Sequence, residues 1–323
     1  MKLKIVAVVA LIFTCALAGC SSKKETTSSS PSPTAQPKPA AVLDGTYRLD
    51  FDRTQQTMDG KPSPEDPYAR TYAFKSTCSG DGNACVAVGI RLNDQDPKQT
   101  APGGAIVLDY LNGEWVRTYN NTQTCRGVQV PVLESWSFKP GDGGAPAVGT
   151  RRLAFTMAPC TGAFEQPLTA TRTGDVDPAV QLPDPAKVAA LKHSAGEGLR
   201  GRYKRTITPA APPAQPTTGE VTVATGCIRN ADHCLTYITA EGANGAPATV
   251  EGYGLMDGLW SLDRPFDGKC PDQAPVNGVT HTEFLEPADA ADPIAKLTGT
   301  QRDLADPCPG TTNADITLER IGD

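Results

Sequence analysis

Eight cysteines divide the chain into two sets of four with nearly the same spacing. Each set opens with a pair seven residues apart, and corresponding cysteines of the two sets lie 149, 149, 145 and 148 residues from each other. Internal similarity at a fixed offset is typical of a duplicated unit. The pattern therefore predicts two copies of one disulfide-containing module. The sets are Cys78, Cys85, Cys125 and Cys160, and then Cys227, Cys234, Cys270 and Cys308.

Other short motifs repeat with the cysteines. One of these motifs carries, in both of its copies, a tryptophan that lies ten residues before the third cysteine of the set. The matched segments are Asn112-Gly113-Glu114-Trp115 and Asp257-Gly258-Leu259-Trp260, Gly149-Thr150-Arg151-Arg152 and Gly299-Thr300-Gln301-Arg302, and Gly45-Thr46-Tyr47 and Gly201-Arg202-Tyr203. Chance does not account for so many aligned landmarks, so the whole module is duplicated.

Each module has the pattern of short β-strands. Hydrophobic and polar residues alternate, or form short apolar runs, between turn residues, as expected of an antiparallel meander. The expected strands of the first module are residues 46–51, 71–75, 86–90, 105–110, 132–138, 152–157 and 168–173, with one more around Trp115. We predict an all-β chain of two tandem duplicated antiparallel domains, each a barrel-like meander, with a sandwich as the alternative.

The segment between the modules predicts one short helix. Asp184 suits the N-cap, Pro185 suits the first helical position, and Gly196 lies beyond the end. The segment before the first module is rich in Ser, Thr, Pro and Lys and cannot bury a core, so it predicts a flexible stalk. The expected boundaries are 1–19 for a signal peptide, 20–41 for the stalk, 42–176 for module one, 177–197 for the linker and 198–323 for module two.

The N-terminus has the build of an export signal. Lys2 and Lys4 precede an apolar run from Ile5 to Ala18, which is too short for a comfortable transmembrane helix. The run ends in Leu17-Ala18-Gly19-Cys20 and resembles a bacterial lipoprotein signal. That resemblance implies a diacylglycerol on Cys20, cleavage before it, and a cell-membrane location on the extracytoplasmic face. The alternative is an ordinary cleaved signal in which Cys20 is incidental.

An exported chain with an even number of remaining cysteines predicts disulfides. Four cysteines allow three pairings, and spacing alone leaves them open. We favour a disulfide between the first two cysteines of each set, because a turn-like segment lies between them. The third and fourth cysteines of the set would then form a second disulfide that closes a longer loop. The expected disulfides are Cys78–Cys85, Cys125–Cys160, Cys227–Cys234 and Cys270–Cys308.

Seven short segments of the first module carry a family resemblance. They are residues 43–49, 55–57, 73–78, 85–89, 108–110, 113–115 and 170–176. Together they resemble the extracellular sensor region of mycobacterial transmembrane Ser/Thr protein kinases, over most of residues 43–183. The second module resembles that region through the repeat. The resemblance implies an outward-facing sensor. The kinase signatures, a glycine-rich loop followed by a lysine, are absent from the sequence.

Catalytic and nucleic-acid-binding patterns are weak. The three histidines, His193, His233 and His281, have no counterpart in the first module. A Ser-His-Asp or Cys-His site needs a positioned base, so we expect no enzyme, cofactor or metal site. Once Lys2 and Lys4 leave with the signal, 28 basic residues face 36 acidic ones, a formal charge of −8. With no basic run, this charge argues against nucleic acid as a partner.

Three tryptophans are the candidates for ligand contact. Trp115 and Trp260 recur at one position of the repeat, whereas Trp136 has no tryptophan counterpart and Phe284 lies nearest in the second module. Large aromatic side chains in small β domains are mostly buried, so a core role is favoured over a ligand platform.

These observations lead to one functional hypothesis and two alternatives. The leading one is a non-catalytic cell-envelope lipoprotein that acts as a sensor-like binding protein. It would be attached to the membrane through its lipid, and its ligand would be an envelope lipid, a glycan or a peptide. The first alternative is a structural or assembly lipoprotein that docks another envelope protein. The third reading is an envelope hydrolase.

Overall fold

The computed structural model describes most of the chain beyond the predicted stalk. The described residues are 42–79, 84–141, 144–157, 160–211, 215–242, 246, 248–269, 275–285, 291–305 and 312–323. The expected signal peptide, stalk, lipid site at Cys20 and disulfide Cys270–Cys308 lie outside them. Residues 38–323 form one compact unit. In the described part of the chain, no helix is long and apolar enough to span a membrane.

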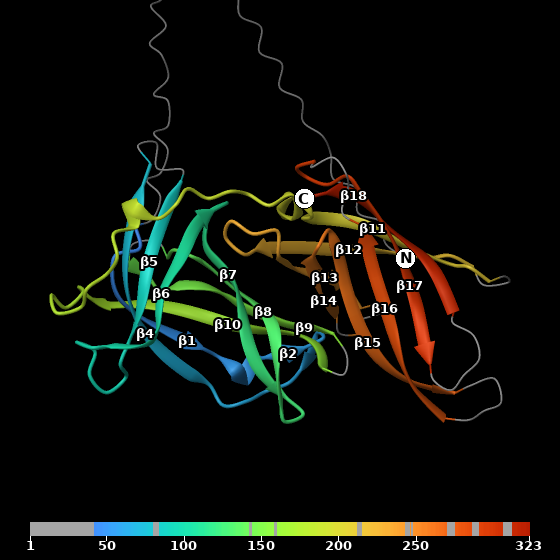
Figure 1. Cartoon of the computed structure of the whole chain (residues 1–323), viewed down its shortest axis with the longest axis horizontal. Coiled ribbons are helices and arrows are strands. Elements are labelled where there is room, and N and C mark those ends of the chain that lie inside the picture. Colours follow the sequence, from blue (N-terminus) through green and yellow to red (C-terminus); the bar gives the residue numbers. More distant parts are fainter. Residues whose placement is uncertain are drawn as a thin grey trace, which may run out of the picture. The chain divides into compact units, whose positions relative to one another are not determined.

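The first module is a closed antiparallel barrel (Figure 1). Its eight strands follow one another around the barrel, and the last pairs with the first. They are β1 (Gly45–Phe51), β4 (Tyr68–Cys78), β5 (Cys85–Leu92), β6 (Thr100–Leu111), β7 (Glu114–Cys125), β8 (Val128–Lys139), β9 (Ala147–Met157) and β10 (Cys160–Gly174). A 3-10 turn, η1 (Arg53–Gln55), leads to a small hairpin of β2 (Thr57–Met58) and β3 (Lys61–Pro62) that pairs with β10.

The second module repeats this barrel. Its strands are β11 (Gly201–Pro209), β12 (Thr217–Cys227), β13 (Cys234–Ala240), β14 (Thr249–Met256), β15 (Leu259–Lys269), β16 (Pro275–Leu285), β17 (Lys296–Ala305) and β18 (Thr312–Gly322). β11 closes the barrel against β18. The all-β prediction of two tandem copies is confirmed, and each copy is a barrel and not a sandwich.

A glycine begins the first strand of each barrel. Gly45 and Gly201 have φ angles of +117° and +101°, in a region that L side chains rarely adopt. A Cβ on either would lie 2.6 Å from the carbonyl oxygen of the last strand, at Gly174 or Gly322. The first strand can therefore approach the last closely enough to close the sheet, and this requirement explains why the motif recurs.

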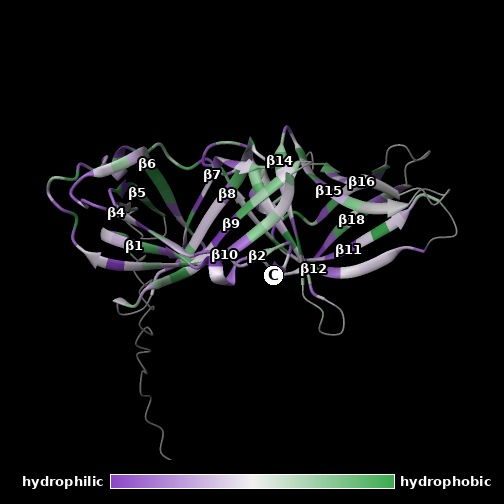
Figure 2. Cartoon of the chain, turned by 90° about the horizontal axis from the view of Figure 1, so that it is seen from below, coloured by the Kyte–Doolittle hydropathy of each residue, from purple (hydrophilic) through white to green (hydrophobic). Residues whose placement is uncertain are grey.

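The barrel interiors are filled by side chains from alternate strand positions. Hydrophobic and hydrophilic residues alternate along the strands of both barrels (Figure 2). The interior of the first barrel is centred on Trp115, Phe74 and Phe138, and that of the second on Trp260 and Phe284, all at most 1% exposed. Small barrels of eight strands have room for side chains and little else, so these rings form the core.

The two repeated tryptophans differ in one hydrogen bond. The indole Nε1 of Trp260 donates to Thr236 Oγ1 at 3.0 Å. The indole Nε1 of Trp115 is buried and has no partner among the described residues. Thr236 lies two residues after Cys234, and the same position after Cys85 is Ala87. The second barrel therefore has an acceptor for the indole at a position where the first barrel has none.

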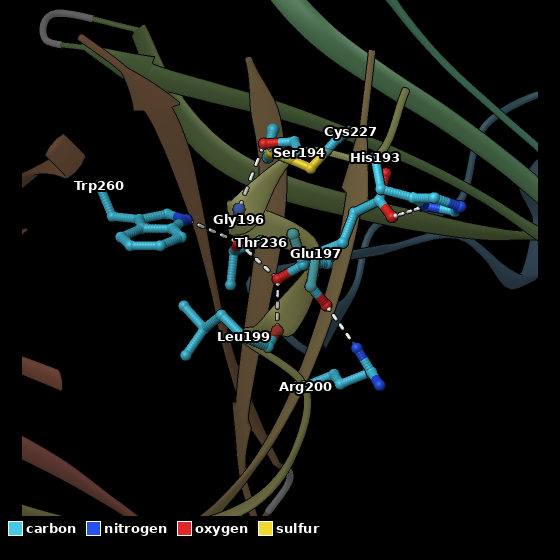
Figure 3. Close-up of a disulfide and its surroundings, with 11 residues drawn as sticks. His193, Ser194, Gly196, Glu197, Leu199, Arg200, Cys227, Thr236 and Trp260 are labelled. Atoms are coloured by element: carbon cyan, nitrogen blue, oxygen red, sulfur yellow. Dashed lines mark hydrogen bonds and ion pairs between the residues drawn. A yellow bond between two sulfur atoms is a disulfide. The ribbon is translucent and has the colours of Figure 1, made fainter. Parts of the chain in front are cut away.

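The linker packs against the end of the second barrel (Figure 3). The hydroxyl of Thr236 also bonds Thr225 Oγ1 at 2.7 Å, and Thr225 donates to the carbonyl of Leu199 at 2.6 Å. A Cβ on Gly196 would lie 2.8 Å from Cys234 Sγ and 2.6 Å from Leu255. The lack of a side chain at Gly196 therefore lets the linker sit directly on the barrel core.

Two short 3-10 turns stand in place of the predicted linker helix, and only the first lies where that helix was expected. They are η3 (Pro185–Lys187) and η4 (Ala195–Gly198). The expected cap is present, since Asp184 accepts a hydrogen bond from the backbone N–H of Ala186 at 3.1 Å. The chain becomes extended at Val188, because a single isolated turn lacks the propagation that sustains a helix in water.

The Trp260–Thr236 bond predicts a stability loss for Thr236→Val. The substitution keeps the side-chain shape but leaves the buried indole N–H without an acceptor, which should lower the free energy of unfolding by about 1–3 kcal/mol. Chemical denaturation of the full chain measures it. Thr222→Val, at an exposed position of the same β12–β13 pair, is the control. Equal stability of the two variants would contradict the proposed role of the bond.

Candidate binding site at the seam of the first barrel

The wall of the first barrel opens between β6 and β7. These strands are described throughout, and they pair only where residues 109–111 face residues 114–116. Beyond this hairpin the two strands continue without pairing with each other. We call this opening the seam. The second barrel has a similar opening, since β14 and β15 pair over residues 254–256 and 259–261.

The second barrel packs against the outer wall of the first. Leu235 and Tyr237 of β13 form a cluster with Leu133, Ala154 and Ala163 of the first barrel. The hydroxyl oxygen of Tyr237 lies 2.8 Å from the backbone carbonyl oxygens of both Leu153 and Phe164, so its one proton can serve either. Burial raises the pKa of this phenol, which keeps it protonated and able to donate.

A glycine permits the close approach of the two walls. A Cβ on Gly252 of β14 would lie 2.6 Å from the Cβ of Ala154 and 3.2 Å from the Cβ of Ala163. The neighbouring atoms belong to short side chains on strands and have no freedom to move aside. Gly252 therefore sets the distance between the barrels.

A cavity of about 330 Å³ lies at the seam, between the two barrels. We call it the seam cavity. From the first barrel it is bordered by Asp109, Arg117 and Trp136, and from the second by Thr225 and Arg229 among others. Its volume is at the lower end of the range for small-molecule sites.

One ion pair joins the barrels beside this cavity. Arg229 Nε lies 2.9 Å from Asp109 Oδ2, with side chains that are 20% and 13% exposed. Arg229 belongs to the loop that the disulfide Cys227–Cys234 closes. The second barrel thus supplies a wall of the cavity and also a cross-link at its border.

A buried carboxylate organises the interior of the first barrel. Glu134 Oε1 accepts hydrogen bonds from Trp136 Nε1 at 2.8 Å, from Arg151 Nε at 2.6 Å and from the Tyr119 hydroxyl. Its Oε2 accepts from Arg151 Nη2 and from Asn121 Nδ2, each at 2.8 Å. Burial acts to raise the pKa of Glu134, but the hydrogen bonds and charge of Arg151, with the bonds from Tyr119 and Asn121, hold it below its ordinary value.

Arg117 is the second cation of this interior. The carbon of its guanidinium lies 3.7 Å from the ring centroid of Tyr119 and 5.3 Å from that of Trp136, a cation–π arrangement. Burial lowers the pKa of the Arg117 guanidinium, yet arginine remains charged in proteins. Among the described residues no carboxylate forms an ion pair with it. The interior thus holds two arginines for one carboxylate.

The second barrel lacks this cluster. The register places Phe284 opposite Trp260 as Phe138 stands opposite Trp115, so Phe284 is the counterpart of Phe138 and not of Trp136. The counterpart of Trp136 is then Thr282. Counting along the same strands, Thr280, Leu262 and Gln301 replace Glu134, Arg117 and Arg151.

The cysteines and tryptophans singled out by the sequence lie as follows. Disulfides join Cys78 to Cys85, Cys125 to Cys160 and Cys227 to Cys234. All three tryptophan side chains are buried in the barrel cores. Trp136 in addition borders the seam cavity, and the sequence reasoning missed its neighbours Arg117 and Glu134. The available signal was polar residues at the same alternating positions as Trp115 and Trp136.

Two of the three histidines lie beside carboxylates. His193 Nδ1 lies 2.6 Å from Glu197 Oε2 on the surface, and His281 lies between Asp263 and Glu283 at 2.6 and 2.9 Å. The described part of the chain contains no group of three or more His, Cys, Asp or Glu side chains placed to hold a metal ion.

Comparison with known proteins agrees with the resemblance seen in the sequence. Residues 38–187 match the family described as the PknI serine/threonine-protein kinase sensor domain. The serine/threonine-protein kinase PknI of Mycobacterium tuberculosis (strain ATCC 25618 / H37Rv) and that of Mycobacterium bovis are each 31% identical over 172 residues, which cover 50% of this chain and 29% of the kinase. The predicted resemblance to a kinase sensor domain is confirmed. The chain spans under a third of the length of these kinases.

Two solved structures are also similar. The monomer form of the M. tuberculosis PknI sensor domain has 27% sequence identity and a TM-score of 0.40, and covers 46% of this chain and 98% of its own. The dimer form of that domain has 28% identity and a TM-score of 0.34, and covers 47% and 99%.

The Glu134 cluster predicts a pH-dependent loss of stability for Glu134→Gln. Removing the charge leaves Arg151 buried without its partner and should lower the free energy of unfolding by about 3–5 kcal/mol near pH 7. Because the pKa of Glu134 is lowered by folding, its contribution is present above the unfolded-state value of about 4.3 and disappears as the pH falls.

Denaturation of wild type and variant at several pH values between 7 and 3 tests this. The difference between them should shrink toward acid. Glu165→Gln, which removes a half-exposed partner of Arg152 in the same barrel, should change the stability by at most about 1 kcal/mol. A difference for Glu134→Gln that stays constant with pH would contradict the assignment.

The contact at Gly252 predicts that Gly252→Ala is destabilising. The added methyl group meets Ala154 and Ala163 and should cost about 1–3 kcal/mol through overpacking. Thermal or chemical unfolding of the full chain measures the effect. Gly219→Ala is the matched control, because a Cβ there meets nothing within 4 Å. If both substitutions were equally harmless, the barrels would not be packed as described.

Proposed function

We propose that this chain is a sensor-like binding protein of the cell envelope that holds a small ligand in the seam cavity. The carrying observation is that cavity, where a kinase-sensor-like barrel opens its wall and a second barrel covers the opening. Ligand sites are concave, combine apolar walls with a few placed polar groups, and favour domain interfaces. The seam cavity has each of these properties.

The proposed role is non-catalytic. The matched family is a sensor domain. The polar side chains that border the cavity are mainly arginines, carboxylates and hydroxyls, and they include no histidine. Such groups are suited to recognise and orient a molecule.

The proposed location is the extracytoplasmic face of the cell membrane. Residues 1–19 would direct export and be removed, the diacylated Cys20 would anchor the chain, and residues 20–41 would form the stalk before the first barrel. Two acyl chains are sufficient for stable anchoring. The lipid and stalk would then take the place of the membrane helix that links a kinase sensor region to its catalytic domain.

Native mass spectrometry of the full protein extracted from its own membrane tests ligand binding. We expect a bound small molecule that survives purification and is released on unfolding. A chain that is free of small molecules, and instead retains a stoichiometric protein partner, would overturn the proposal in favour of a docking role.

Cys20→Ala tests the anchor. The variant should lose the diacylglycerol mass and move from the detergent phase to the aqueous phase, because two acyl chains supply the membrane affinity. Phase partition and intact mass measure it. Cys15→Ala, within the expected signal, is the control and should leave the mature product unchanged. If Cys20→Ala partitioned like wild type, Cys20 would not be the lipid site.

A further inference from the structure

We infer that Arg117 is the ligand-recognition residue of the seam cavity, and that the ligand is a small organic anion with one oxyanion group on a hydroxyl-bearing body. The inference rests on the proposed function and specifies the chemistry of the same site. It follows from the charges that border the cavity, from the position of Arg117 and from the polar wall around it.

Arg117 is the unmatched charge at the cavity. Four arginines and three carboxylates of the described residues border it. They are Arg117, Arg152, Arg200 and Arg229, with Asp109, Glu114 and Glu197. Each of the other arginines has a carboxylate partner, because Arg229 pairs with Asp109, Arg152 with Glu165 and Arg200 with Asp292. A bound anion would give Arg117 the partner that these three already have.

The carboxylate nearest in the interior is already occupied. The two oxygens of Glu134 accept five hydrogen bonds, two of them from Arg151. Glu134 attracts Arg117 across the barrel interior but has no oxygen left for a paired contact. A cation that is removed from water without a close anionic partner is unfavourable. A ligand that supplies this partner therefore gains binding free energy.

The geometry of Arg117 suits an oxyanion. Its guanidinium carbon lies 3.7 Å from the centroid of the Tyr119 ring, and Tyr119 also takes one of its hydrogen bonds. These contacts fix the guanidinium, which has five N–H donors in all. A planar guanidinium binds a carboxylate or a phosphate through two parallel hydrogen bonds. The aromatic support lowers the entropy lost on binding, because the arginine is already ordered.

The other residues that line the cavity indicate what the rest of the ligand is like. Hydroxyl and apolar side chains both border the cavity. The hydroxyls are those of Thr118, Ser135, Ser137, Thr225 and Tyr237, and the apolar side chains are those of Val107, Leu111, Val116, Trp136, Leu191, Ala224 and Leu235. Hydroxyl groups both donate and accept hydrogen bonds, so this mixed wall, around a cavity of about 330 Å³, fits a compact hydroxyl-bearing molecule such as an acid sugar.

Three hexose probes of similar size test the inference on the full chain. Glucuronate carries a carboxylate, glucose 6-phosphate carries a phosphate and glucose carries neither. Ligand-observed NMR titration should show saturable binding of at least one of the anions, with glucose at least about tenfold weaker. The comparison of the two anions decides between a carboxylate and a phosphate ligand.

Variants locate the binding. Arg117→Met removes the charge and keeps a long side chain, and should weaken binding of the anion about tenfold or more. Arg117→Lys keeps the charge without the planar fork and should give an intermediate affinity, provided that both variants unfold at temperatures near that of wild type. Arg48→Gln, at an exposed arginine paired with Asp50 on the outside of the same barrel, is the control and should bind like wild type.

Several results would overturn the inference. They are glucose binding as tightly as the anions, no saturable binding of either anion, or unchanged affinity in folded Arg117→Met and Arg117→Lys. If native mass spectrometry then found a neutral molecule bound, the proposed function would stand and the charge assignment would fail. An absence of bound small molecules in both experiments would remove the proposed function as well.

Discussion

Closure of each sheet on itself is the constraint on which the rest of this structure depends. Pairing of β1 with β10, and of β11 with β18, leaves neither barrel with an open edge along its first or last strand. Closure needs a glycine at Gly45 and Gly201, because any Cβ there would strike the carbonyl of the last strand. It also encloses a narrow interior, which large side chains must fill from alternate positions. Every interior residue is therefore both a packing element and a candidate for chemistry.

Duplication made two barrels, and substitutions within the interior made them different. Two residues after Cys234 the second barrel has Thr236, which bonds Trp260. Two residues after Cys85 the first barrel has Ala87, and the Trp115 indole has no hydrogen-bond partner among the described residues. The opposite difference is found on β7 and β8, where the first barrel has a charged cluster and the second has Thr280, Thr282 and Leu262. The first barrel therefore has one internal hydrogen bond fewer at its repeated tryptophan and a cluster of polar groups beside the seam.

The fold could be predicted because its determinants are local and repeated. Alternating strands, turns such as Asn112-Gly113 with φ angles of 52° and 86°, and the cysteine spacing all point to one antiparallel meander. The site could not be predicted in the same way, because it depends on the register between strands. Arg117, Glu134 and Arg151 lie on three strands, and their convergence follows from pairings such as Trp136 with Arg151. The linker was predicted as a helix from its N-cap. In the structure it contains two 3-10 turns, and its Gly196 packs directly against Leu255 and Cys234 of the second barrel.

The second barrel changes what the first can do. In a single barrel with an open seam, Arg117 and Trp136 would face solvent through the gap between β6 and β7, where water weakens a charge–charge contact. Packing of β12 and β13 over that gap, held by Tyr237 and by the Arg229–Asp109 pair, turns an exposed slit into a partly covered cavity. On the proposed function, the same guanidinium would act in a less polar medium, where an oxyanion would bind more strongly and a neutral molecule would gain little. Discrimination by charge would then arise from the tandem arrangement and not from the sensor-like barrel alone, which would give a physical reason for a chain with two barrels.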